Sequence, residues 1–260
     1  MNLKSKIVLA LLATSSAAFA QTAPAAATPE VTYNVGVVSQ YRYRGIAQTK
    51  GDPALQGGVD YANANGFYAG AWGSTIKWIK DASEGTGYKQ PKGPVELDLY
   101  AGYKFEAAGV AYDVGYLRYE YVGNTYKDAA PAGNVNANTD EVYGAATYGV
   151  FTAKYSHAFS NLFGWGGSRD SHYVDLSANF DLGQGYSLVP HVGRQVIEGT
   201  NHGYSYNDYA LTLNKDLGNG LSASVAAIAT NGKKEVFELT SKSSYNTAKD
   251  AVVVGVKYSF

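Results

Sequence analysis

Pairs of like charges two positions apart are the part of this sequence best placed to do chemistry. Arg42 and Arg44 form one pair, and Glu96 and Asp98 form another. Residues i and i+2 of a β-strand point to the same side, so each pair would face one way. Opposed across a narrow lumen, the pairs would set up a transverse field that orients and selects polar solutes. As a network of salt bridges they would instead brace a wall. The sequence leaves both interpretations open.

Further charged residues occupy the polar side of alternating segments and are candidates for the same lumen. They are Asp60, Lys104, Asp113, Lys154, Asp175, His191 and Lys257. Acids and bases are mixed among them, so their number predicts no preference for anions or cations.

Enzymatic and metal chemistry find little support in the sequence. The histidines are scattered without the spacing of metal ligands; they are His157, His172, His191 and His202. No Ser lies in the motif that a Ser–His hydrolase would need. The Gly-rich stretch 164–167 does not join a strand to a helix, as a phosphate-binding loop must. We therefore expect no catalytic residue, no metal and no cofactor, and a net charge of −1 gives no indication of nucleic-acid binding.

Alternation of apolar and polar residues with period two predicts the strands that position these side chains. The clearest alternation lies in residues 31–44, 95–105, 172–182, 208–217 and 221–229. Less regular strands are expected near 53–62, 66–79, 110–121, 140–149, 151–159, 186–197 and 251–260. From Gly66 to Lys80, apolar residues occupy both sides, so the orientation of that strand is not predicted. Many segments reach ten residues, which is long for the soluble β-sandwich that would also alternate.

The connections between these strands alternate in length. Short ones carry Gly and Asn, which tolerate positive φ, and include 63–66, 107–109, 182–185 and 217–220. Long ones include 80–94, 123–139, 160–171 and 231–250. Tyr and Phe gather beside the short turns, as in an interfacial girdle. Together these features predict an all-β transmembrane barrel, antiparallel and up-and-down, of about twelve strands with short periplasmic turns and long extracellular loops.

Both chain ends fit an exported barrel. Lys4 and Lys6 precede an apolar run, and Ala18-Phe19-Ala20 reads as a cleavage site, so residues 1–20 are expected to be a signal peptide. Residues 21–30 are expected to be a disordered tail, and 31–260 the barrel. The last strand ends in Phe260, which we expect the barrel-insertion machinery to recognise. The predicted location is the outer membrane of a Gram-negative bacterium, in contact with its lipid.

Three stretches near the N-terminus carry a resemblance to a known family. They are Asn34 to Thr49, with Tyr41-Arg42-Tyr43-Arg44-Gly45 at its centre, then Pro53 to Tyr61, then Gly66 to Ser74. These stretches resemble the TorF-type putative porin family of proteobacteria, and the segments starting at Glu141 and Ala153 look similar too. The resemblance implies an outer-membrane barrel with a channel role. It implies no particular substrate and no catalytic residue.

Two functions from different classes follow as expectations. The first is a porin-like channel for passive diffusion of small hydrophilic solutes through a narrow charged lumen. The second is a non-conducting barrel with an enzymatic or structural, adhesive role. Eight-stranded barrels are filled by side chains and sixteen-stranded ones hold a wide channel, so twelve strands predict a narrow or plugged lumen.

Overall fold

The computed structural model is a closed β-barrel of twelve antiparallel strands. It describes residues 29–83, 89–128, 135–239 and 244–260. The strands of the wall are β1 (Glu30–Val38), β4 (Ala54–Ala62), β5 (Phe67–Thr75), β6 (Val95–Ala107), β7 (Val110–Tyr121), β8 (Thr139–Tyr148), β9 (Phe151–Ala158), β10 (His172–Ala178) with its continuation β11 (Phe180–Gly183), β12 (Tyr186–Val196), β13 (Tyr206–Gly218), β14 (Leu221–Thr230) and β17 (Ala251–Ser259). Neighbours in the chain are neighbours in the sheet, and β1 pairs with β17 to close it. The predicted fold class is confirmed.

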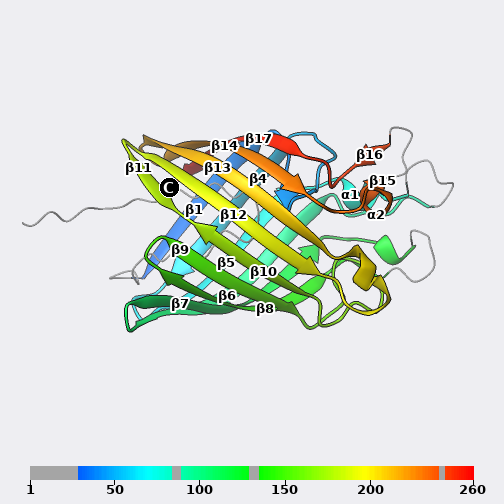
Figure 1. Ribbon diagram of the computed structural model, residues 1–260, viewed down its shortest axis with the longest axis horizontal. Coiled ribbons are helices and arrows are strands. Elements are labelled where there is room, and N and C mark those ends of the chain that lie inside the picture. Colours follow the sequence, from blue (N-terminus) through cyan, green and yellow to red (C-terminus); the bar gives the residue numbers. More distant parts are fainter. Residues whose placement is uncertain (1–28, 84–88, 129–134, 240–243) are drawn as a thin grey trace, which may run out of the picture.

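The two ends of the barrel differ (Figure 1). One end, here called the short-turn end, carries tight hairpins together with Glu30 and Phe260. The other, the long-loop end, carries the short elements of the long connections. These are β2 (Arg42–Tyr43), β3 (Ile46–Ala47), α1 (Trp78–Asp81), η1 (Tyr126–Asp128), η2 (Gly199–Tyr204), α2 (Lys234–Phe237), β15 (Glu238–Leu239) and β16 (Tyr245–Asn246). No helix among the described residues is long and apolar enough to cross a membrane.

The hairpin between β13 and β14 shows why the short turns need Asn and Gly. Only Asn219 and Gly220 separate the two strands, with φ of 52° and 81°. Two central residues with positive φ define the turn whose twist matches that of the flanking strands. The prediction of a tight turn at 217–220 is confirmed.

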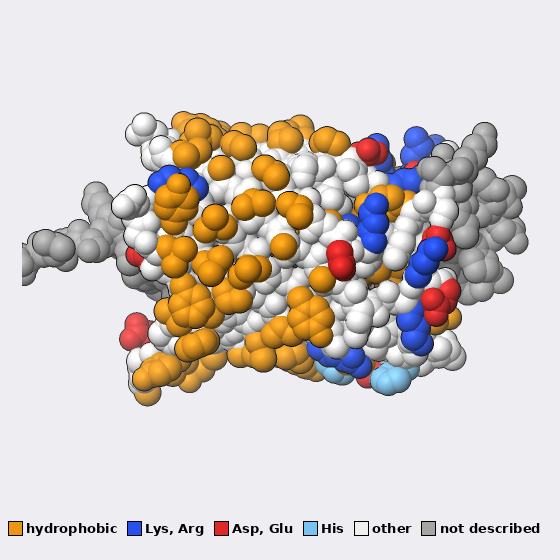
Figure 2. Space-filling model, turned by 45° about the horizontal axis from the view of Figure 1, so that its top comes forward, with side chains coloured by type: hydrophobic (Ala, Val, Ile, Leu, Met, Phe, Trp, Pro, Cys, Tyr) orange, Lys and Arg blue, Asp and Glu red, His pale blue; other side chains and the backbone are white. Residues whose placement is uncertain are grey.

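The outer face of the barrel is apolar and the inner face is not. On β17, Val252 is 64% exposed and Val254 53%, whereas Val253 between them is 2% exposed. Figure 2 shows hydrophobic side chains covering the barrel wall from the short turns toward the long loops, where charged side chains take over. An apolar band of this kind matches the hydrocarbon layer of a bilayer.

The strand whose orientation the sequence left open is now oriented. Trp72 is 4% exposed and points inward, and Phe67 is 43% exposed and points outward. The predicted extension of this strand to residue 79 is wrong: β5 ends at Thr75, and the chain turns into α1. Ile76 and Ile79 are both buried there, so their apolar character serves packing against other loops and not a lipid-facing strand.

A second correction concerns the first strand, which was expected to run from 31 to 44. β1 ends at Val38, and the connection to β4 folds back into the barrel. We call residues 39–53 the inserted segment. Tyr41, Arg42, Tyr43 and Arg44 are each at most 5% exposed, so they lie inside the barrel and not on its wall. The alternation of this stretch continues past Val38 because its aromatic residues pack against the inner wall.

The predicted signal peptide (1–20) and most of the predicted tail (21–30) lie outside the described residues.

Candidate functional site in the barrel interior

The structure places all predicted lumen residues except Arg42 and Arg44 on the inward side of wall strands. Each alternates with lipid-facing neighbours. They are Asp60 on β4, Glu96, Asp98 and Lys104 on β6, Asp113 on β7, Lys154 on β9, Asp175 on β10, His191 on β12 and Lys257 on β17. Period-two alternation therefore gave their orientation correctly.

Charges of opposite sign follow one another around part of the inner wall. Lys104 lies opposite Asp113, Lys154 lies opposite Asp175, and Ala145 on β8 separates the two pairs. Because the strands tilt, this row climbs from the short-turn end of β6 toward the long-loop end of β10. The wall thus presents alternating fixed charges to anything inside it.

His191 joins two acids on neighbouring strands. Its Nδ1 lies 3.0 Å from Asp175 Oδ2, and its Nε2 lies 2.8 Å from Asp208 Oδ1. The hydroxyl of Tyr173 donates to Asp208 at 2.9 Å. Asp208 is not among the predicted lumen residues, although it lies on the polar side of a predicted strand and the same alternation identifies it.

Tyrosine hydroxyls donate hydrogen bonds to two of the remaining inward-facing acids. Tyr68 donates to Asp113 at 2.5 Å, and Tyr100 donates to Asp60. The ammonium group of Lys154 lies 4.0 Å from the centre of the Tyr143 ring. These contacts brace the wall and reduce the number of charges open to a solute.

The inserted segment is fastened to the wall by Arg44. Its Nη2 donates to Glu141 Oε2 at 2.8 Å and its Nη1 to Gln195 Oε1 at 2.6 Å. The guanidinium also lies 4.3 Å from the ring centre of Tyr173. Arg44 and Glu141 are both nearly inaccessible to solvent, so the pair is a buried, charge-assisted contact. In the sequence, Glu141 appears only as the start of a segment that resembles the TorF-type family, and Arg44 lies 97 residues away in the chain.

Arg42 points elsewhere. Its Nη1 donates to the backbone carbonyls of Gly45 at 2.9 Å, Thr247 at 3.3 Å and Lys249 at 2.5 Å. It thereby anchors the inserted segment to the loop before β17. The expectation that Arg42 and Arg44 share one side and face Glu96 and Asp98 is wrong, because Arg42 begins the two-residue strand β2 and Arg44 lies in the turn after it, with a φ of 45°.

The accessibility of the interior changes along the barrel axis. Near the short-turn end, inward side chains such as Asp60, Lys104 and Lys257 remain partly exposed. Near the long-loop end, Glu96, Asp98 and Glu141 are each 1% exposed beneath the inserted segment. Aromatic contacts fill this end, including those of Tyr41 with Trp72 and of Tyr43 with Tyr119. In this conformation the long-loop half of the lumen is closed.

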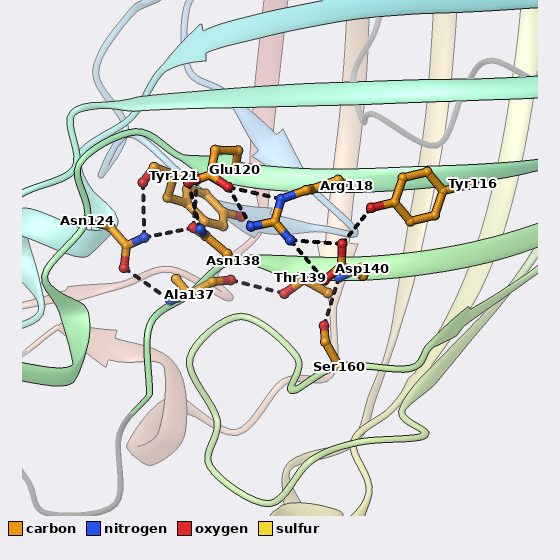
Figure 3. A network of polar contacts seen from close by, with 10 residues as sticks. All are labelled: Tyr116, Arg118, Glu120, Tyr121, Asn124, Ala137, Asn138, Thr139, Asp140 and Ser160. Atoms are coloured by element: carbon orange, nitrogen blue, oxygen red, sulfur yellow. Dashed lines mark hydrogen bonds and ion pairs between the residues drawn. The ribbon is translucent and has the colours of Figure 1, made fainter.

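A second polar network lies on the outside of the barrel, at the long-loop end of β7 and β8 (Figure 3). Arg118 donates to both oxygens of Asp140 at 2.9 and 3.0 Å and to Glu120 at 2.7 Å. The hydroxyl of Tyr116 reaches Asp140 at 2.6 Å. Arg118 on β7 binds two acids, one of them Asp140 on β8, so this network ties the two strands together where the apolar band ends. None of its residues is among the sequence-predicted site residues.

Metal binding is not indicated by the geometry. Across the described ranges, no group of three or more His, Asp or Glu side chains is arranged to hold a metal ion.

A closed up-and-down barrel, with an apolar outer band and a charged interior, defines a transmembrane β-barrel of the outer-membrane type. The chain belongs to Gcw_chp, described as a bacterial protein family of unknown function, whose model matches residues 22–260.

Solved structures with a similar fold are outer-membrane porins and channels. The NanC porin matches with a TM-score of 0.54 and 10% identity, covering 88% of this chain and 99% of NanC. The KdgM porin, solved in complex with disordered oligogalacturonate, matches with a TM-score of 0.52 and 10% identity, covering 88% and 98%. An outer-membrane channel from Pseudomonas putida F1 gives 0.50 and 12%, covering 89% and 95%. At these identities the likeness shows the fold alone. No curated protein sequence matches this chain.

Proposed function

We propose that this protein is an outer-membrane channel through which small hydrophilic solutes diffuse passively along a narrow, charged lumen. The observation that carries the proposal is the inner wall, where acidic and basic side chains alternate from Lys104 to Asp175. Fixed charges of both signs along the wall suit the passage of polar solutes through a lumen. The porin names of NanC and KdgM favour transport over an enzymatic role.

The inserted segment controls this passage. It closes the long-loop half, so solutes pass only when Tyr41, Tyr43 and Arg44 leave their contacts with the wall. Asp60, Lys104, Asp113, Lys154, Asp175, His191 and Lys257 line the remaining path. Arg42 holds the segment to the loop before β17 and does not line the path.

The experiment that tests the channel compares the whole protein with a shortened one in planar bilayers. Val38 and Ala54 lie opposite each other in the β1–β4 ladder. Residues 39–53 can therefore be replaced by Asn-Gly, which makes a two-residue hairpin. We expect low or intermittent conductance from the whole protein and steady conductance from the folded, shortened barrel. No conductance from either folded protein would refute the channel.

The second candidate function is a non-conducting barrel with a structural or adhesive role. The closed long-loop half favours it, because contacts such as that of Tyr41 with Trp72 fill the lumen as a core would. In the same experiment, this role predicts that the shortened barrel loses stability and gains no more than a leak that is indifferent to the wall charges.

The orientation and export of the chain are part of the proposal. The short-turn end would face the periplasm and the long loops the outside, with lipid around the apolar band. Phe260 supports recognition by the insertion machinery: it is 64% exposed at the barrel seam, and its backbone pairs with Tyr33 at 2.8 and 2.9 Å. A signal peptide cut before Gln21 and the TorF-type family label complete the proposal. N-terminal sequencing of protein from purified outer membranes tests the cut, and recovery from the soluble periplasm would contradict the location.

A further inference from the structure

Glu96 and Asp98 form an acidic pair at the long-loop end of β6, enclosed by the wall and the inserted segment. Each is 1% exposed. Glu96 Oε1 accepts a hydrogen bond from the Tyr41 hydroxyl at 2.8 Å. Glu96 Oε2 and both carboxylate oxygens of Asp98 have no hydrogen-bond partner among the described residues. Native proteins rarely leave buried carboxylate oxygens in this state.

No cation among the described residues compensates this pair. Two basic side chains of the inserted segment bind elsewhere: Arg44 binds Glu141 and Gln195, and Arg42 binds backbone carbonyls. Charged groups that act on Asp98 are the carboxylates of Glu96 and Glu141, which are acids themselves. If both carboxyl groups are ionised, the enclosure holds an excess of negative charge that a bound cation would neutralise.

Aromatic rings surround the pair. On the wall, Trp72 of β5 and Tyr119 of β7 lie directly opposite Asp98, and Tyr121 lies opposite Glu96. The inserted segment covers them with Tyr41, which meets Trp72 edge-on at 5.6 Å, and Tyr43, which meets Tyr119 at 5.5 Å. Ring faces carry a negative potential and attract cations, most strongly where water is excluded.

We propose that Glu96, Asp98 and their aromatic enclosure bind a small organic cation bearing an ammonium group, which makes cationic amines the solute class of this barrel. The solute class rests on the proposed channel function, whereas the binding site is inferred from the burial and contacts of Glu96 and Asp98. Three carboxylate oxygens without a hydrogen-bond partner, surrounded by aromatic rings, suit an alkylammonium group better than a divalent metal, which would need more oxygen ligands. The ligand enters when the inserted segment lifts, because Tyr41 and Tyr43 belong to that segment.

The binding experiment uses the purified full-length barrel in detergent. Its unfolding temperature is measured against increasing methylammonium chloride, with potassium chloride and glucose at matched concentrations. A ligand that binds only the folded protein raises the unfolding temperature with concentration. We expect methylammonium to do so more than potassium, and glucose to give no specific effect.

Three variants show whether methylammonium binds at Asp98 or responds only to the overall charge of the protein. Asp98→Asn keeps the shape of the side chain and removes its charge, so we expect the apparent affinity for methylammonium to fall about tenfold or more. Glu106→Gln removes an acid from the exposed short-turn end of the same strand and should leave the response unchanged. Trp72→Leu keeps the charge and removes a ring, and should also weaken the response; it serves as the second variant if Asp98→Asn does not fold.

The possible outcomes test the cation site and the channel function separately. An Asp98-dependent methylammonium response without bilayer conductance would keep the site and remove the channel. Conductance with an unchanged response in Asp98→Asn would keep the channel and overturn the site. An equal response to potassium and methylammonium would also overturn the inference, since an inorganic cation would then be the ligand.

Discussion

Arg44 is the residue on which the closure of the lumen depends most directly. Its contact with Glu141 is buried on both sides, at 2% and 1% exposure. Arg44→Met would leave the buried carboxylate of Glu141 with the Tyr119 hydroxyl but without its cationic partner, which costs about 3–5 kcal/mol. We expect a matching drop in the free energy of unfolding, measured by denaturant titration of the refolded barrel. Arg44→Met combined with Glu141→Gln should recover most of it, and additive losses would contradict the coupling.

Gly45 allows the tip of the inserted segment to approach the wall. Its φ is +78°, and a Cβ there would stand 2.8 Å from Asp208 Cβ and 3.0 Å from Thr230 Cγ2. We expect Gly45→Ala to push the segment from the wall and raise bilayer conductance severalfold. Gly123→Ala is the control, because Gly123 has a φ of +64° and open space around it. Equal conductance in the two variants would show that backbone strain, and not contact with the wall, decides the result.

The residue-level predictions from sequence succeeded wherever one strand decided the answer. Asp98 and Lys154 point inward as period two requires. Arg42 and Arg44 did not follow this rule, because alternation continues in the sequence after β1 has ended at Val38. Nothing local distinguishes a tyrosine that faces lipid from one that packs inside the barrel. The pairing of Arg44 with Glu141 depends on contacts 97 residues apart, which no spacing rule predicts.

Introducing a charge can test which face of a wall strand contacts lipid. Leu211 on β13 is 49% exposed on the outer face, and Asn214 on the same strand is half-buried on the inner face. Leu211→Arg places a charge in the hydrocarbon layer and should cost roughly 2–4 kcal/mol near its middle. Asn214→Arg should cost much less, because position 214 lies on the polar inner face, away from the hydrocarbon layer. Folding titrations into lipid vesicles measure both, and equal costs would contradict the assigned faces.

At the scale of elements, turn chemistry and alternation predicted the twelve strands. The sites at 107–109 and 217–220 are tight hairpins, as Gly and Asn at those positions indicated. The end of the strand beginning at Phe67 was predicted too late, because Ile76 and Ile79 continue its apolar character into a loop and α1. Loops that pack inside a barrel carry the same apolar residues as strands, so composition alone cannot place that boundary.

For the whole molecule, the sequence predicted a barrel and a narrow lumen but not which half is closed. The short-turn half depends on individual strands and was foreseeable from their polar sides. The long-loop half is closed by contacts between Tyr43, Tyr119 and Phe163, which come from three separate connections or strands. Such packing arises only after the barrel has closed, and it is the reason that a channel and a plugged barrel looked alike in the sequence.

The orientation of the molecule in its membrane is the broadest prediction. Gly167 lies in a long connection, is exposed and has open space around it, so an epitope inserted there should leave the fold intact. Gln184 lies in the tight turn between β11 and β12 at the opposite end and is also exposed. If long loops face outward, an antibody should label the Gly167 insertion on intact cells. It should reach the Gln184 insertion only after the outer membrane has been permeabilised. Comparable yields of heat-modifiable, folded protein show that both insertions are tolerated. Labelling of the Gln184 insertion on intact cells, with none at Gly167, would show the reverse orientation. The inserted segment would then close the lumen from the periplasmic side. Cations could reach Asp98 only from the periplasm.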